Sequence, residues 1–189
     1  LLTAIIVVSI LRDRIVRFSD NQVTVYGQGK ISYAPDEATV TLGVQVDKVW
    51  SAEEALRQLN DKIKRIIDAE KAIGISEEDI KTESYNLYPQ YDYNNGTSNV
   101  SGYSANEHLI VKVRNVKDNP ELAGKVISSA SAAGVNQILG VNYYVSDLNS
   151  IKQQARLAAI ADAKSKAEGI FKAAGIKPGK VVGWYENNL

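Results

Sequence analysis

The stretch Ile80–Arg114, IKTESYNLYPQYDYNNGTSNVSGYSANEHLIVKVR, decides the fold of this chain. Two alternating runs flank the polar tip Asn94–Asn99, and alternation with a period of two is typical of a half-buried β-strand. Asn95-Gly96 within the tip supplies the positive φ that a tight connection requires. The pattern predicts a long β-hairpin, which also carries five of the ten tyrosines.

Strands and helices are predicted on both sides of this hairpin. Runs 22–28 and 38–46 alternate as strands do, and apolar residues at helical spacing predict helices over about 51–73, 119–132 and 150–174. With further strands at 139–146 and 180–186, the order is β-β-α-β-β-α-β-α-β. It contains the split β-α-β core of ferredoxin-like folds. We expect an α+β fold, with a mainly antiparallel sheet and helices packed on one face.

A short repeat marks the predicted helix ends. Ala72-Ile73-Gly74-Ile75, Ala132-Ala133-Gly134-Val135 and Ala173-Ala174-Gly175-Ile176 each close a helical stretch. Glycine suits the left-handed position after a helix, and the next aliphatic residue can fold back onto the last turn. The final helix has a face of small, alanine-rich side chains, so we expect it to pack closely on another helix or flat on a sheet.

Composition excludes several classes of function. The 189 residues suit one domain, or one domain with an appendage. The 22 basic and 22 acidic residues balance, and no block of like charge provides the basic face of a nucleic-acid binder. The sequence has no cysteine, which excludes disulfides and thiolate metal sites.

The first eighteen residues form a separate apolar segment. Leu1–Leu11 carries no charge, but it is shorter than the roughly 20 residues needed to span a bilayer. No small-residue cleavage pattern follows, so we expect 1–18 to be the end of an uncleaved membrane anchor. The alternatives are a signal-peptide remnant and an amphipathic helix that packs on its own domain. Residues 19–189 are predicted to form that domain.

No candidate active site emerges. His108 is the single histidine and reads as an exposed strand residue, because one imidazole without cysteine makes a poor metal site. Asp162 and Lys166 are spaced as a stabilising helix pair. Asp61, Asp68, Asp79 and Asp118 are expected to be solvated, and the sequons at Asn95 and Asn99 read as turns. We predict no catalytic, cofactor-binding or metal-binding residue.

The tyrosines of the hairpin are the candidate interface: Tyr85, Tyr88, Tyr91, Tyr93 and Tyr103. All except Tyr88 share a face if the hairpin register holds. They could cover their own sheet, or they could contact another protein, since tyrosine offers a large contact area at little entropic cost.

Several motifs in order resemble one family. They are VTVYGQG at 23–29, PDEATV at 35–40, Gly74-Ile75 with DIKT at 79–82, LYPQY at 87–91, GYSAN at 102–106, and the helical pattern from Ala155 to Glu168. Together they are similar to SIMPL-domain proteins, a group that includes periplasmic oxidative-stress-defence proteins and a bacterial outer-membrane antigen.

The resemblance implies an α+β fold, an export signal or anchor, and ring-like homo-oligomers without established catalytic residues or cofactors. We therefore expect a non-enzymatic, homo-oligomeric envelope protein in the periplasm or at the cell surface, membrane-anchored and linked to stress defence. Without methionine or cysteine, sacrificial sulfur oxidation is not its chemistry. The alternatives are a module that binds cell-wall glycan or a small ligand on its aromatic face and, with least support, an enzyme.

Overall fold

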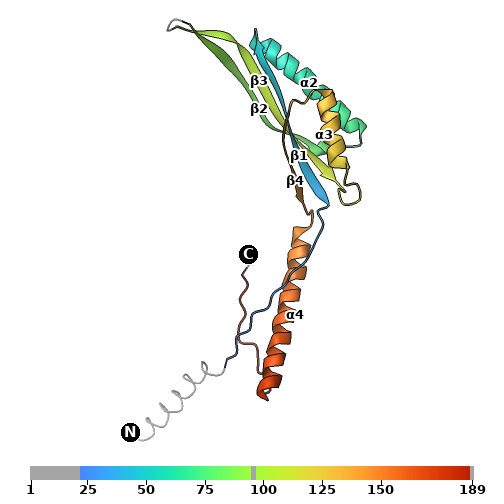
Figure 1. Cartoon of the computed structure of the whole chain (residues 1–189), viewed down its shortest axis with the longest axis vertical. Helices are drawn as coiled ribbons and strands as arrows, with labels where there is room; N and C mark the ends of the chain where they lie inside the picture. The colour runs from blue at the N-terminus through green and yellow to red at the C-terminus, as the bar shows by residue number, and fades with distance from the viewer. Residues whose placement is uncertain (1–21, 95–96, 188–189) are drawn as a thin grey trace, which may run out of the picture. The chain divides into compact units, whose positions relative to one another are not determined.

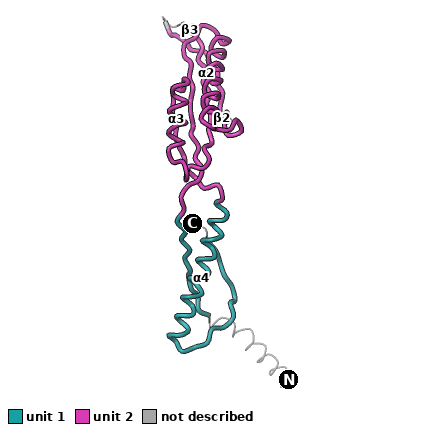
Figure 2. The backbone as a smooth tube through the Cα atoms, turned by 90° about the vertical axis from the view of Figure 1, so that its right-hand side faces the viewer, with its two compact units in different colours: residues 1–32, 148–189 teal, residues 33–147 magenta. Residues whose placement is uncertain are grey.

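The computed structural model describes residues 22–94 and 97–187, which fall into two compact units (Figure 2). Unit 2 is residues 33–147, and unit 1 combines residues 1–32 with 148–189. Across the described ranges, no helix has the length and apolar character needed to cross a membrane. The anchor expected over 1–18 lies outside the described residues.

Unit 2 is built on a four-stranded sheet with strand order β2-β3-β1-β4. Its strands are β1 (Glu37–Val49), β2 (Ile80–Asn94), β3 (Thr97–Arg114) and β4 (Gln137–Tyr144). Every neighbouring pair is antiparallel. Helix α2 (Ala52–Ala72) and the short 3-10 helix η1 (Glu77–Asp79) join β1 to β2, and α3 (Leu122–Ala133) joins β3 to β4. This confirms the α+β class and the ferredoxin-like core.

The core of unit 2 lies between the sheet and its two helices, which cover one face of the sheet (Figure 1). Alternate residues of β1 from Ala38 to Val46 face the helices and are at most 5% exposed. The register pairs Val40 with Val111 and Leu42 with Leu109, which extends this apolar row onto β3. The helices add Leu59, Ile63 and Ile66 from α2, and Ala123, Val126 and Ala130 from α3.

All three predicted helix ends form. Gly74, Gly134 and Gly175 adopt positive φ values of 96°, 122° and 69°. After α2, the Gly74 amide donates to the Lys71 carbonyl and the Ile75 amide donates to that of Glu70, the paired bonds of a Schellman motif. Equivalent bonds close the other two helices.

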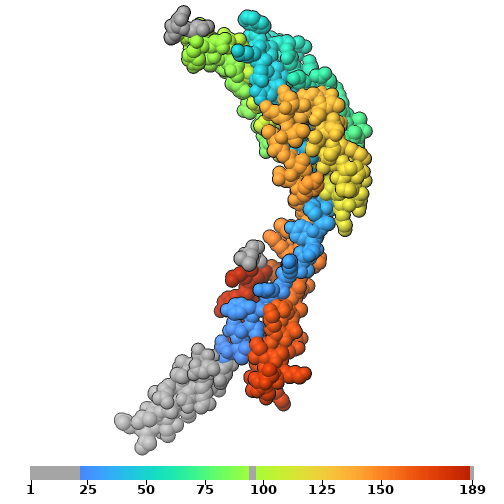
Figure 3. Space-filling view, in the orientation of Figure 1, coloured from blue at the N-terminus to red at the C-terminus, as the bar shows by residue number. Residues whose placement is uncertain are grey.

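The described part of unit 1 consists of helix α4 (Leu148–Ala174) and two segments without regular structure, residues 22–32 and 175–187. The strands predicted at 22–28 and 180–186 were wrong, because neither segment pairs with a strand. Alternation makes a segment suitable for a sheet, but a strand also needs a neighbour for its backbone groups. Residues 22–30 lie instead along α4 (Figure 3).

Candidate functional site

The register of the hairpin places four of the five candidate tyrosines on one face. Tyr85, Tyr91 and Tyr93 are odd-numbered residues of β2 and lie on the same face as Pro89. Pro89 is the cross-strand partner of Tyr103, which therefore shares that face. Tyr88 pairs with Ser104 and lies on the opposite face. Tyr103 is half-buried against the core, and the Tyr85 hydroxyl donates a 3.0 Å hydrogen bond to Oδ1 of Asn60 on α2. These two tyrosines therefore support unit 2 itself.

The other two tyrosines of that face lie on what we call the hairpin arm, residues 90–94 and 97–102. Here β2 and β3 pair only with each other, because the last pair between β1 and β3 is Val49 with Tyr103. Tyr91 and Tyr93 are 50% and 79% exposed. Tyr85 is 44% exposed as well, but its hydroxyl is bound to Asn60, so Tyr91 and Tyr93 are the most exposed tyrosines of the set.

Gly102 fixes the base of the arm. A Cβ atom on this glycine would lie 3.2 Å from backbone atoms of Lys48 and Val49, where the pairing of β1 with β3 is irregular. Lys48 has a φ of 50°, and its ammonium is 3.8 Å from the Asp92 carboxylate on the arm. The glycine in the GYSAN motif thus allows the bulged end of β1 to lie directly on β3.

In unit 1, two glycines let residues 22–30 lie against the backbone of α4. A Cβ atom on Gly27 would be 1.9 Å from the Ala159 carbonyl oxygen, and one on Gly29 would be 1.8 Å from that of Ala155. The alanines recur every four residues, which keeps them on one side of the helix. The small face predicted for this helix therefore receives an extended segment.

Asp162 and Lys166 tether the same segment. The predicted pair is confirmed, with Lys166 Nζ 2.7 Å from Asp162 Oδ2. The Gln28 amide also donates to Asp162 Oδ2 at 2.8 Å, and Lys166 Nζ donates to the Tyr26 carbonyl at 3.0 Å. Lys166, followed by the Gln28 amide, lowers the pKa of Asp162. The i,i+4 spacing indicated the ion pair, but it did not indicate that the same two side chains also bind the backbone of Tyr26 and Gln28.

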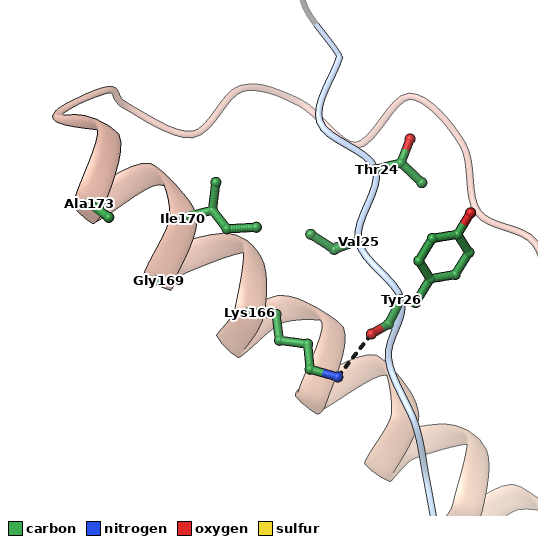
Figure 4. Close-up of a pocket in the computed structure, with 7 residues that line it drawn as sticks. All are labelled: Thr24, Val25, Tyr26, Lys166, Gly169, Ile170 and Ala173. Atoms are coloured by element: carbon green, nitrogen blue, oxygen red, sulfur yellow. Dashed lines mark hydrogen bonds between the residues drawn. The ribbon is translucent and has the colours of Figure 1, made fainter.

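A shallow, open groove of about 550 Å³ lies between this segment and α4 (Figure 4). Thr24, Val25 and Tyr26 line one side, and Lys166, Gly169, Ile170 and Ala173 line the other. Val25 and Ile170 point toward each other, while the Tyr26 ring turns away from the helix. The groove is mainly apolar.

The apolar residues of unit 1 are unusually exposed. Ile176, which follows the last helix, is 53% exposed, whereas its counterparts Ile75 and Val135 in unit 2 are 7% and 8% exposed. Trp184 and Tyr185 are 64% and 97% exposed. No residue of α4 is buried, and every buried apolar residue of the described chain lies between Ala38 and Val135.

Buried charge gathers at one end of the sheet in unit 2. Asp79 was expected to be solvated, but it is 6% exposed and accepts two hydrogen bonds from Arg114, at 2.6 and 2.8 Å. The Arg114 guanidinium lowers the pKa of the Asp79 carboxyl. Glu37 pairs with Lys112 at 2.8 Å. These groups compensate one another, so the cluster stabilises the sheet and offers no unpaired acid or base.

The described residues hold no group of three or more His, Cys, Asp or Glu side chains able to bind a metal ion. The expectation that His108 is exposed was wrong: it is half-buried, because its ring lies against its cross-strand partner Gly43, which has no side chain. The expectation that the protein has no catalytic residue and no cofactor stays a prediction.

Comparison with known proteins identifies relatives. The family described as "SIMPL: Protein of unknown function (DUF541)" matches residues 23–188. The 26 kDa periplasmic immunogenic protein of Brucella melitensis biotype 1 is 31% identical over 166 residues, 85% of this chain and 64% of that protein. The uncharacterized protein YggE of Escherichia coli K12 is 28% identical over 142 residues, 75% of this chain and 56% of that protein.

The chain spans less than two thirds of the length of these relatives. A solved structure, the Bacillus cereus protein related to NIF3, is 13% identical with a TM-score of 0.33 over 60% of this chain and 26% of that one. That likeness is too slight to support any conclusion. The family match, in contrast, runs from residue 23 to residue 188 and includes every motif quoted above. This chain belongs to the SIMPL family.

Proposed function

We propose that this chain is a non-enzymatic, homo-oligomeric protein that acts outside the cytoplasm, and that a second copy covers the exposed faces of its unit 1. One observation carries the proposal: α4 has 27 residues and none of them is buried. Helices in proteins derive most of their stability from packing an apolar face. Residues 22–30 contact α4 through its alanines and beside Lys166 and Ile170, and other apolar residues of the helix stay exposed.

The remaining surface of unit 1 is suited to association. On α4, Leu157 and Ile160 are 57% and 50% exposed and lie three residues apart, on one face of the helix. No backbone–backbone hydrogen bond in the described chain involves residues 177–187. Glu186 of this segment pairs with Arg156 of α4 at 2.9 Å, which is one contact that holds the segment to the helix. Exposed apolar clusters are a feature that proteins normally cover.

The overall charge supports another copy as the partner. With 22 basic and 22 acidic residues, copies of the chain have no net charge to drive them apart. The exposed residues at issue are apolar or aromatic, which favours contact with an equally apolar surface. Tyr91 and Tyr93 on the hairpin arm provide a second contact in this proposal.

The names of relatives support the location. The Brucella relative is named a periplasmic protein, and we extend that location to this chain. Attachment through residues 1–18, a ring-like arrangement of copies and a role in stress defence complete the proposal. The 189 residues contain no methionine or cysteine, so this role would not use sacrificial sulfur oxidation.

The direct test is the mass of the whole chain in mild detergent, measured by sedimentation over a wide concentration range. We expect a defined multimer. A strict monomer at the highest concentration would refute the proposal.

Variants locate the contacts. Fully burying a leucine or isoleucine is worth about 1.5–3 kcal/mol, and these side chains are already half covered. Leu157→Ser with Ile160→Ser should therefore raise the dissociation constant roughly ten- to a hundredfold. The matched control is Lys152→Ser with Lys164→Ser, which changes exposed polar positions of the same helix. Tyr91→Ser with Tyr93→Ser tests the arm, and an unchanged mass would clear the arm of this role.

A further inference from the structure

Glu70 is an acidic residue buried without a partner. Four acidic residues of the described chain are buried: Glu37, Glu70, Asp79 and Glu107. Three have partners: Glu37 bonds to Lys112, Asp79 to Arg114, and Glu107 to the Thr82 hydroxyl. Glu70 is 0% exposed, and neither of its carboxylate oxygens accepts or donates a hydrogen bond.

The position of Glu70 makes a negative charge costly. It lies in the last turn of α2, where the carbonyl ends of the helix disfavour an anion. Of the described polar groups, only the Ser129 hydroxyl of α3 acts on its carboxyl, and the two groups are not in strict hydrogen-bonding geometry. Burial, opposed weakly by Ser129, raises the pKa of Glu70 from 4.5 to about 7.

Among the described residues, no cation is placed to compensate the charge of Glu70. On α2, Lys71 bonds to Glu77, and Lys62, two turns earlier, lies beside Gly134. The single titratable residue of α3 is Lys125, which bonds to Glu121.

The sheet and η1 supply none either. The helix-facing residues of β1 are apolar, and β4 contributes Val141 to the core. Glu107 on β3 bonds to Thr82, Tyr85 on β2 bonds to Asn60, and Asp79 of η1 bonds to Arg114. None of these groups contributes to the pKa shift of Glu70, whose causes are burial and Ser129 alone.

We propose that Glu70 is a proton-operated brace between α2 and α3: when neutral, its carboxyl packs as part of the core, and when ionised it loosens the contact between the two helices. Because we place the protein outside the cytoplasm, the brace would respond to the pH of the surroundings. The physical inference itself does not depend on that location or on assembly.

The sign of the effect follows from linkage. The folded state holds the Glu70 proton more tightly than the unfolded state, so its stabilising contribution is complete below pH 4.5 and is lost as pH rises through about 7. A separation of about 2.5 pKa units corresponds to a roughly 300-fold change in the ratio of folded to unfolded protein.

The experiment measures unfolding of the whole wild-type chain and of Glu70→Gln from pH 4 to pH 9, in detergent at fixed protein concentration. We expect the wild type to lose stability relative to the variant by roughly 300-fold across this range, with the variant the more stable above pH 7. Taking the difference between the two proteins cancels the contribution of every titrating group that they share. Glu53→Gln, on the exposed side of α2, is the control and should leave the profile unchanged.

Parallel profiles for wild type and Glu70→Gln would overturn the proposal. If the variant fails to fold, carboxyl ¹³C NMR of the wild-type protein gives the answer directly. A Glu70 titration midpoint near 7 supports the brace, and one at or below 4.5 refutes it. Amide protection factors, which are corrected for the base-catalysed rise in the intrinsic exchange rate, should fall at the end of α2 above pH 7 while those in β1 stay unchanged.

Discussion

Gly29 and Ala155 touch so closely that a Cβ atom on the glycine would lie 1.8 Å from the alanine carbonyl oxygen. Gly27 stands in the same relation to Ala159. The order of unit 1 therefore depends on the absence of side chains at two positions in the extended segment.

Gly29→Ala should detach residues 22–30 from α4. The Ala155 obstacle is helix backbone, which cannot shift cheaply, so we expect the local contact to lose about 1–3 kcal/mol. Faster amide hydrogen exchange at Gln28 is the measurement. Gly179→Ala is the matched control, because it changes a glycine of the same unit with open space around it. Equal exchange rates in both variants would show that the contact does not order the segment.

Asp162→Asn should weaken the same contact by another route. Asparagine can still accept from the Gln28 amide, but it loses the charge that holds Lys166 near Tyr26. We therefore expect exchange at Gln28 to quicken less than in Gly29→Ala. Lys164→Gln removes an exposed lysine whose pairing with Glu168 is longer, at 4.0 Å, and should have no effect. If Lys164→Gln quickens exchange at Gln28 as much as Asp162→Asn does, the effect comes from the overall charge of the helix and not from this contact.

Gly102→Ala should destabilise unit 2, whereas Gly124→Ala should stabilise it. At Gly102 the new methyl meets the Lys48 and Val49 backbone at 3.2 Å, and we expect a loss of about 1 kcal/mol, at the low end for overpacking. Gly124 lies on α3 with open space around it, and alanine there should gain about 0.5–1 kcal/mol because glycine is a poor helix former. Thermal unfolding compares the two. If the midpoint of thermal unfolding moves in the same direction in both variants, the close contact of Gly102 with the bulged end of β1 does not limit stability.

The Asp79–Arg114 pair should weaken in acid. Arg114 lowers the pKa of Asp79 below 3.8, so the folded state holds that proton less tightly than the unfolded state. The contribution of the pair is present above pH 3.8 and is lost as pH falls through the folded-state pKa. Asp79→Asn should abolish this acid-dependent part of the unfolding profile. The pH range of this loss lies below that of Glu70, so one titration separates the two effects. If Asp79→Asn loses as much stability in acid as the wild type, other carboxyl groups cause that loss.

Sequence patterns were sufficient where an interaction spans a few residues. Gly74, Gly134 and Gly175 were predicted to end helices because a Schellman motif closes within six residues of chain. Alternation along β1 and the hairpin likewise predicted which side chains share a face, since the two faces of a strand follow directly from its geometry.

Glu70 shows a signal that was present but missed. It follows Ile66 by four residues and precedes Ile73 by three, so it continues the apolar stripe of α2. Glutamate is ordinarily a solvated residue, but the helical phase of this one predicts burial. Asp79 carries no such signal, because its partner Arg114 is 35 residues away.

By itself, the sequence determined the α+β class, the split β-α-β core, the helix ends and the membership of the family, because each depends on local geometry or on motifs in order. Only the tertiary structure decided that residues 22–28 and 180–186 are not strands, that Gly27 and Gly29 lie against α4, and that Glu70 has no partner. Those outcomes depend on which distant backbone or side chain occupies the adjacent space, and no local pattern records that.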